Sequence, residues 1–118
     1  MTSFIDPSML GQYRDVMGAE GDEFIKDLVQ TFLIDAEKLT NQMYQALEDG
    51  DQEIFQRSAH TLKTSVATMG AKEPAKRFKE MELKSEMNDF AGLSDELDIA
   101  SKELRSVYDE LKELFLDN

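Results

Sequence analysis

The sequence of 118 residues holds a single histidine, His60, and Lys63 follows it three residues later. Imidazole is a nucleophile and a proton acceptor that works near neutral pH. On a helix, residues three apart lie on adjacent parts of one surface, so the ammonium group of Lys63 would stand beside the imidazole. The two residues therefore point to chemistry at an exposed imidazole, carried out with a partner that docks over it.

The residues around His60 have the periodicity of an amphipathic helix, which we expect to run to about Met69 and to end at Gly70. Its apolar positions recur at steps of four, three, four and three, and they are Phe55, Ala59, Leu62, Val66 and Met69. At about 100° per residue, His60 points roughly 140° away from the centre of this stripe. Its neighbours on the helical wheel are Gln56, Lys63, Thr64 and Ala67. We expect these side chains to form the surface around an exposed imidazole.

Helical periodicity also extends over four further segments. They are a short helix at about 7–17 that begins at Asp6-Pro7, a long helix at about 22–48, a shorter one at about 72–87 and a last one at about 93–115. The segment 18–21 should separate the first two helices. The buried face of the last helix should consist of Leu97, Ala100, Leu104, Val107, Leu111 and Leu114.

Short turns between long amphipathic helices favour antiparallel neighbours. We therefore expect an all-α fold in one domain that spans residues 1–118. Its architecture should be an up-and-down antiparallel four-helix bundle at about 22–116, with a short extra N-terminal helix.

The composition argues against several classes of function. A net charge of −12 disfavours binding to nucleic acid or to an anionic membrane surface. A chain with one histidine and no cysteine is a poor source of metal ligands, so we expect no metal site and no cofactor. No apolar run approaches the roughly 20 residues of a membrane span, and no leader-like segment opens the chain. We expect a cytoplasmic protein, and no second catalytic group supports an independent enzyme.

Charge is spread unevenly along the chain. Residues 57–84 carry seven basic and three acidic side chains, a net charge of +4, which leaves −16 for the remainder. This positive segment includes His60, so we expect it to attract an acidic partner. Lys76, Arg77 and Lys84 are the side chains that we expect to steer such a partner.

The histidine segment resembles the signature of histidine-containing phosphotransfer (HPt) domains. It reads Ala59-His60-Thr61-Leu62-Lys63-Thr64-Ser65 and closes with Met69-Gly70-Ala71. Segment 24–36 is similar to the long second helix of the family, and segment 46–51 resembles the turn before its histidine helix. Met81-Glu82 matches a Leu-Glu or Ile-Gln pair on the following helix. With the Gly-Asp turn nine residues before His60 and a glycine ten after it, the resemblance covers nearly the whole chain.

This resemblance implies an intermediate of a two-component phosphorelay. His60 would accept a phosphoryl group from a receiver-domain aspartate, through its outer ring nitrogen, and pass it to another receiver domain. Lys63 would offset the charge of the phosphoryl oxygens. Glu82 occupies a position where relatives often have glutamine, and it would orient the imidazole through the other ring nitrogen. The residues that would support the site or border the docked partner are Gln56, Thr64, Ala67 and Glu82.

The resemblance also implies what the chain would depend on. The family has no ATP site and does not phosphorylate itself, so the chain would be a phosphocarrier with phosphotransfer activity and no kinase activity of its own. Its partners would be receiver domains of response regulators and of hybrid histidine kinases, and the receiver would bring Mg²⁺. We expect the chain itself to be a monomer that binds neither nucleic acid nor membrane.

The chain departs from the family at Thr64, where glycine is common. This side chain lies one helical turn beyond His60, where it would limit how closely a receiver approaches. An alternative therefore stays open, namely a degenerate HPt-like binding module that docks to receivers without phosphotransfer. Ser65 lies on the far side of the helical wheel from His60, and we assign it to helix packing.

Overall fold

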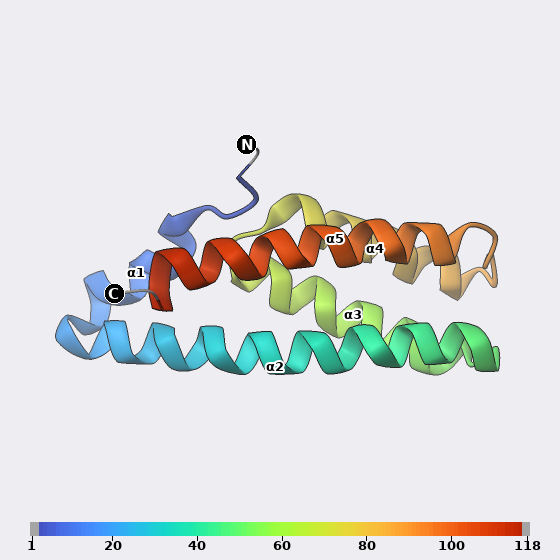
Figure 1. The fold of residues 1–118 in the computed structure, drawn as a ribbon, viewed down its shortest axis with the longest axis horizontal. Helices are drawn as coiled ribbons and strands as arrows, with labels where there is room; N and C mark the ends of the chain where they lie inside the picture. The colour runs from blue at the N-terminus through green and yellow to red at the C-terminus, as the bar shows by residue number, and fades with distance from the viewer. Residues whose placement is uncertain (1–2, 117–118) are drawn as a thin grey trace.

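The computed structural model describes residues 3–116, and every regular element within that range is a helix. The helices are α1 (Pro7–Met17), α2 (Ala19–Asp49), α3 (Gln52–Thr68), α4 (Lys72–Glu86) and α5 (Leu93–Leu111), followed by the π-helix η1 (Lys112–Leu116). The prediction of an all-α fold is therefore confirmed (Figure 1).

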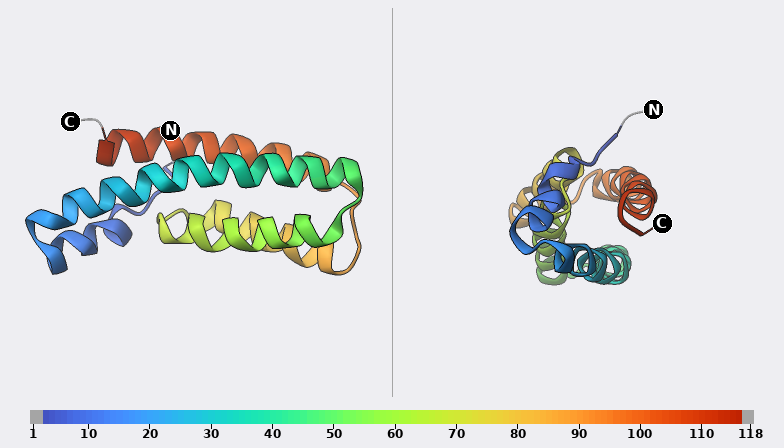
Figure 2. Two further views of the ribbon diagram at one scale, coloured as in Figure 1. Left: turned by 90° about the horizontal axis from the view of Figure 1, so that it is seen from below. Right: turned by 90° about the vertical axis from the view of Figure 1, so that its left-hand side faces the viewer.

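Helices α2 to α5 form a bundle along one long axis. Helix α2 extends over the length of the molecule, and α5 lies alongside it (Figures 1 and 2). Helix α3 packs against both α2 and α4, and α5 packs against both α4 and α2, so the four helices enclose a shared core. Helix α1 packs on α2 at one end of the molecule, which measures 46 × 28 × 19 Å.

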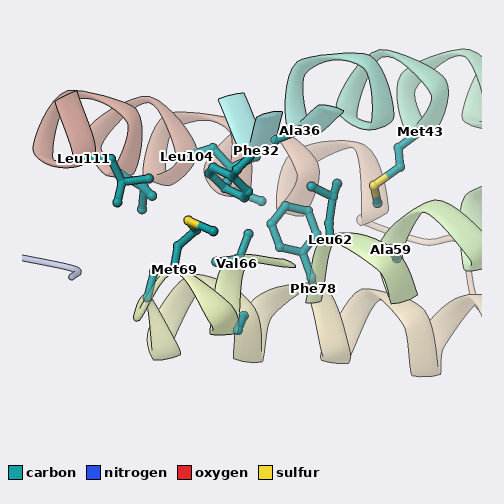
Figure 3. Packing of buried hydrophobic residues seen from close by; sticks show 14 of the residues in the cluster. Phe32, Ala36, Met43, Ala59, Leu62, Val66, Met69, Phe78, Leu104 and Leu111 are labelled. Carbon is teal, nitrogen blue, oxygen red and sulfur yellow. The ribbon is translucent and has the colours of Figure 1, made fainter. Parts of the chain in front are cut away.

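The buried face of α3 is the one that the sequence predicts. Its members are all at most 3% exposed, namely Phe55, Ala59, Leu62, Val66 and Met69. They lie with Phe32 of α2, Phe78 of α4 and Leu104 of α5 in one apolar cluster (Figure 3). Burying a leucine, valine or phenylalanine side chain stabilises the fold by about 1.5–3 kcal/mol. This stripe therefore fixes the rotation of α3, and His60 points away from the core.

Both ends of α3 are fixed by a glycine with positive φ and by hydrogen bonds. At its start, Gly50 has a φ of +69°, and the Asp51 carboxylate accepts a hydrogen bond of 3.1 Å from the amide of Ile54. Beyond its end, Gly70 has a φ of +91°, and a Cβ at this position would lie 2.6 Å from the carbonyl oxygen of Asp6. The amide of Asp6 in turn donates to the Gly70 carbonyl at 2.9 Å. Glycine is therefore required at position 70 by both conformation and space.

Glu110 on α5 binds the segment that precedes α1. One carboxylate oxygen accepts from the amide of Phe4 at 2.7 Å. The other accepts from the Ser3 hydroxyl at 2.7 Å and from the amide of Ile5 at 3.3 Å. Ile5 is only 6% exposed, so its side chain adds to the core while Glu110 satisfies the backbone beside it.

The break between the first two helices is shorter than the segment 18–21 that the sequence predicts. Gly18, with a φ of +66°, separates α1 from α2, and α2 already begins at Ala19. Gly21 is buried within α2, where a Cβ would lie 2.7 Å from the carbonyl oxygen of Tyr13. This glycine therefore permits close packing of α1 on α2 instead of ending a helix.

The prediction that Leu114 belongs to the buried face of the last helix is wrong. Leu114 is 42% exposed, whereas Phe115 is 5% exposed. The change of register comes from η1, because a π-helix pairs residues five apart where an α-helix pairs residues four apart. The position that faces the core therefore moves by one residue.

Candidate functional site

His60 lies on the surface of α3 and is held at one ring nitrogen. Its side chain is 59% exposed. The Nδ1 atom lies 2.8 Å from Oε2 of Glu82, which α4 places opposite. No other described residue of the chain, within 3–116, makes a hydrogen bond to Nε2. The imidazole thus has one nitrogen fixed by the protein and one that faces outward.

Glu82 is the buried member of the site. It is 8% exposed, and its Oε1 accepts a hydrogen bond of 2.9 Å from Nζ of Lys63. Burial raises the pKa of Glu82, but the hydrogen bonds from Lys63 and His60 outweigh this effect, so the pKa lies below its ordinary value. The carboxylate is therefore ionised at neutral pH and can only accept hydrogen bonds.

The ionised carboxylate determines which ring nitrogen carries the proton. Because Glu82 can only accept, Nδ1 of His60 must donate to it, and Nε2 is left with a free electron pair in the neutral ring. Nζ of Lys63 lies 3.3 Å from Nδ1, but both groups are donors, so each is bound to Glu82 and not to the other. Lys63 thus sits on the Nδ1 side of the ring.

The close approach of α3 and α4 creates this arrangement. A short turn joins them, and Phe78 and Met81 on α4 are both fully buried against the core. Glu82 follows Met81 directly and so lies at the edge of the buried face, next to α3. One turn further along, Gln56 donates to the Glu86 carboxylate at 3.0 Å and links the two helices a second time.

The predicted site residues divide into two groups in the structure. His60, Lys63 and Glu82 form one hydrogen-bonded cluster on the α4 side of α3. Thr64 is exposed on the α2 side, where it donates to the backbone carbonyl of His60 at 3.3 Å. There it lines a groove between α2 and α3, together with Phe24, Asp27, Leu28, Thr31 and Ser65 among others. Ala67 is half-buried and packs against the core.

Sequence reasoning missed Gln52 and Glu86. The Gln52 amide donates to Gln56 at 2.9 Å and to the Ser85 carbonyl at 2.9 Å, and Gln56 in turn donates to Glu86. The helical spacing held the signal, because residues 52, 56 and 60 follow one another at steps of four on α3, as do 82 and 86 on α4. This row of polar side chains lies along one seam between the helices and ends at the imidazole.

The described part of the chain offers no group of three or more histidine, aspartate or glutamate side chains that could hold a metal ion. Between residues 3 and 116, no helix is long and apolar enough to cross a membrane.

Comparisons with known proteins define the family. The family model of the Hpt domain matches residues 27–114, a range that includes the cluster of His60, Lys63 and Glu82. The chain therefore belongs to the Hpt domain family and is a phosphotransfer protein of two-component signalling.

One solved structure shares the fold over nearly all of both chains. It is the crystal structure of histidine-containing phosphotransfer protein B (HptB) from Pseudomonas aeruginosa PAO1, which matches with a TM-score of 0.85. The match covers 98% of this chain and 97% of that chain, at 23% sequence identity. No curated protein sequence matches the chain.

Proposed function

We propose that His60 accepts a phosphoryl group from an aspartate of one receiver domain and passes it to an aspartate of another. The observation that supports this most directly is that the imidazole ring of His60 is oriented by a hydrogen bond while one ring nitrogen stays accessible. Nδ1 is fixed by an ionised carboxylate, and Nε2 faces outward from a side chain that is 59% exposed. A nucleophile that must meet an atom of a second protein needs both orientation and access.

The transfer exchanges one bond for another and conserves charge. The electron pair of Nε2 attacks the phosphorus of the aspartyl phosphate on the first receiver. An N–P bond forms as the P–O bond breaks, and the electron pair of that bond leaves on the aspartate carboxylate. The second receiver reverses these steps with its own aspartate. Throughout, the proton on Nδ1 of His60 remains hydrogen-bonded to Glu82.

The partners belong to the same proposal. They are receiver domains of response regulators and of hybrid histidine kinases, which bring the Mg²⁺ ion that phosphoryl transfer from an aspartate requires. The groove between α2 and α3 borders Thr64, one helical turn beyond His60, and offers apolar surface from Phe24 and Leu28 among others. We expect the chain to meet these partners as a monomer in the cytoplasm.

The finer architecture is proposed together with the function. An up-and-down antiparallel four-helix bundle, with α1 as an extra helix and residues 1–118 as one domain, would keep the His60 surface rigid. The course of the chain supports this arrangement, because α2 and α5 run in opposite directions along the long axis (Figure 1). A rigid scaffold suits a site that must align with two different partners in turn.

Thr64 favours a second candidate, a binding module that docks to receivers without phosphotransfer. Its side chain is exposed one turn beyond His60 and stands at the rim of the groove. A β-branched side chain has few rotamers and cannot easily swing aside.

One labelling experiment separates the two candidates. The protein is mixed with a phosphorylated receiver and Mg²⁺, and phosphate that is labile in acid and stable in base is measured on it. We expect label on the wild type and none on His60→Gln. Label that persists on His60→Gln would place the acceptor elsewhere. Receivers that bind the wild type but never label it would establish the docking module instead.

A further inference from the structure

We propose that Glu82 holds Lys63 while His60 is unphosphorylated and gives it up to the phosphoryl group, so that Glu82 shortens the life of the phosphohistidine and favours onward transfer. The inference rests on the proposed function of His60. It assigns Glu82 a positioning role, because this carboxylate acts through His60 and Lys63 and does not itself touch the transferred group.

The first step of the argument is the location of Lys63. Its Nζ atom lies 2.9 Å from Oε1 of Glu82 and 3.3 Å from Nδ1 of His60. The two nitrogens of an imidazole ring point in different directions, so a phosphoryl group on Nε2 lies away from Glu82. In this structure Lys63 therefore lies on the Nδ1 side of the ring, away from the nitrogen that would carry the phosphoryl group. To neutralise the phosphoryl group, it must leave Glu82.

The second step is the competition for one ammonium group. Glu82 is a single negative charge in a nearly buried position, with a side chain 11% exposed, and Lys63 is 28% exposed. An exposed phosphoryl group carries about two negative charges. Partly desolvated ion pairs are stronger than exposed ones, so the buried carboxylate competes although its charge is smaller. Sharing Lys63 leaves each anion less well neutralised than it would be alone.

The third step is the charge of Glu82 itself. Both of its oxygens are engaged before phosphorylation, one by Lys63 and one by His60. When Lys63 moves to the phosphoryl group, Oε1 loses its partner, and the ionised carboxylate keeps only the hydrogen bond from Nδ1 of His60. Onward transfer breaks the N–P bond, returns the electron pair to Nε2 and forms the P–O bond on the receiver aspartate. Lys63 can then bind Glu82 again, so release of the phosphoryl group restores the broken pair.

A glutamine at this position would behave differently. Its amide oxygen can still accept the proton of Nδ1 and orient the ring. It carries no charge, so it holds the Lys63 ammonium more weakly than the carboxylate does. Glu82→Gln therefore keeps the geometry of His60 and removes only the competition for Lys63.

The test uses phosphoramidate, a small phosphoryl donor, to phosphorylate His60 without any receiver. We compare the hydrolysis half-life of the phosphohistidine in the wild type, Glu82→Gln, Lys63→Gln and the double variant. We expect Glu82→Gln to lengthen the half-life by about tenfold and to have no such effect once Lys63 is replaced, since coupled residues are not additive. The matched control is Glu80→Gln, which removes the same charge from an exposed position on α4 and should leave the half-life unchanged.

Two further measurements keep the outcome decisive. The ¹⁵N signals of the unphosphorylated ring report whether Nδ1 still carries the proton in Glu82→Gln, and the equilibrium between phosphohistidine and a receiver aspartyl phosphate should shift by about tenfold toward histidine. An unchanged half-life in Glu82→Gln, or the same lengthening with and without Lys63, would overturn the inference. A wild type that phosphoramidate labels but no receiver labels would contradict the proposed function alone, because the half-lives remain measurable.

Discussion

Arg77 on α4 donates its Nε–H to the carboxylate of Glu103 on α5, and this bond raises the pKa of the guanidinium. Lys84 is bound to Glu96 in the same way along the same seam. Two of the three basic side chains that the sequence suggested for steering a partner are thus engaged within the bundle. The exposed lysines of α4 are Lys72, Lys76 and Lys79, none of which forms an ion pair with another described residue in 3–116.

These three lysines should carry the electrostatic attraction for an acidic receiver. Replacing Lys72, Lys76 and Lys79 with glutamine should slow association several-fold at low salt, because opposite charges accelerate diffusional encounter. The effect should shrink as ionic strength rises toward 0.15 M, where exposed charges are screened beyond about 8 Å. Stopped-flow binding to a cognate receiver measures the association rate and its dependence on ionic strength. Equal association rates at low salt would mean that these lysines are ordinary solvated surface residues and do not steer a partner.

His60 should matter for chemistry and not for folding. Its side chain lies outside the core, and in His60→Gln the new amide can still donate to Glu82 while Lys63 keeps its own bond to that carboxylate. We expect the free energy of unfolding to change by no more than about 0.5 kcal/mol. Urea titration followed by circular dichroism measures this. A loss of several kcal/mol would mean that the imidazole supports the packing of α3 on α4.

Glu82 should make the free energy of unfolding depend on pH in the acidic range. The pKa of Glu82 is lowered in the folded protein, so folding favours the ionised carboxylate. The stability that this carboxylate contributes is fully present above its ordinary pKa and is lost as pH falls through its pKa in the folded protein. The wild type should therefore gain stability relative to Glu82→Gln as pH rises from 3 to 7. Urea unfolding of both proteins across this range checks the sign. A gap that widens toward acid pH would contradict the ionised, doubly bound carboxylate.

Thr64 should control how closely a receiver docks. Thr64→Gly should speed transfer at a cost of a few tenths of a kcal/mol in stability, since glycine is only slightly worse than threonine in a helix. Thr64→Gln should slow transfer without unfolding the bundle. Single-turnover transfer from a phosphorylated receiver compares the three proteins. Identical rates for threonine, glycine and glutamine would show that this position does not border the docked partner.

Gly70 should be far less replaceable than Gly50. Both have a positive φ, but a Cβ at Gly50 meets nothing within 4 Å, whereas one at Gly70 would lie 2.6 Å from the carbonyl oxygen of Asp6. Gly50→Ala should cost about 1 kcal/mol for the backbone conformation alone, and Gly70→Ala should cost clearly more. Thermal and urea unfolding of the two variants tests the difference. Equal losses would mean that the Asp6 segment moves aside freely.

The features that the sequence predicts best are those that depend only on the residues of a single helix. Periodicity identified the buried face of α3 and therefore the outward direction of His60, because both depend only on residues within one segment. Lys63 followed from its spacing on the same helix. Glu82 entered through the resemblance to a family, since no local pattern says which residue of α4 comes to face the imidazole.

What the sequence could not predict depends on how helices meet. The Arg77–Glu103 bond requires the relative rotation and register of α4 and α5, which neither helix specifies alone. Leu114 was misplaced because the change to π-helical pairing in η1 leaves no mark in the apolar spacing. Gly21 looked like a helix break, and only the packing of α1 explains why a residue without a side chain stands there.

The hydrogen bonds between Glu110 and the segment before α1 have a consequence for the order in which the chain can fold. Its bonds join residues 105 to 107 positions apart, whereas those from Glu82 to His60 and Lys63 span 22 and 19. By loop-closure entropy, bringing the distant pair together costs about 1.5 kcal/mol more than closing the α3–α4 hairpin. The reactive histidine and its two partners therefore belong to the most local, most readily nucleated part of the molecule, and the joining of its two ends comes afterwards.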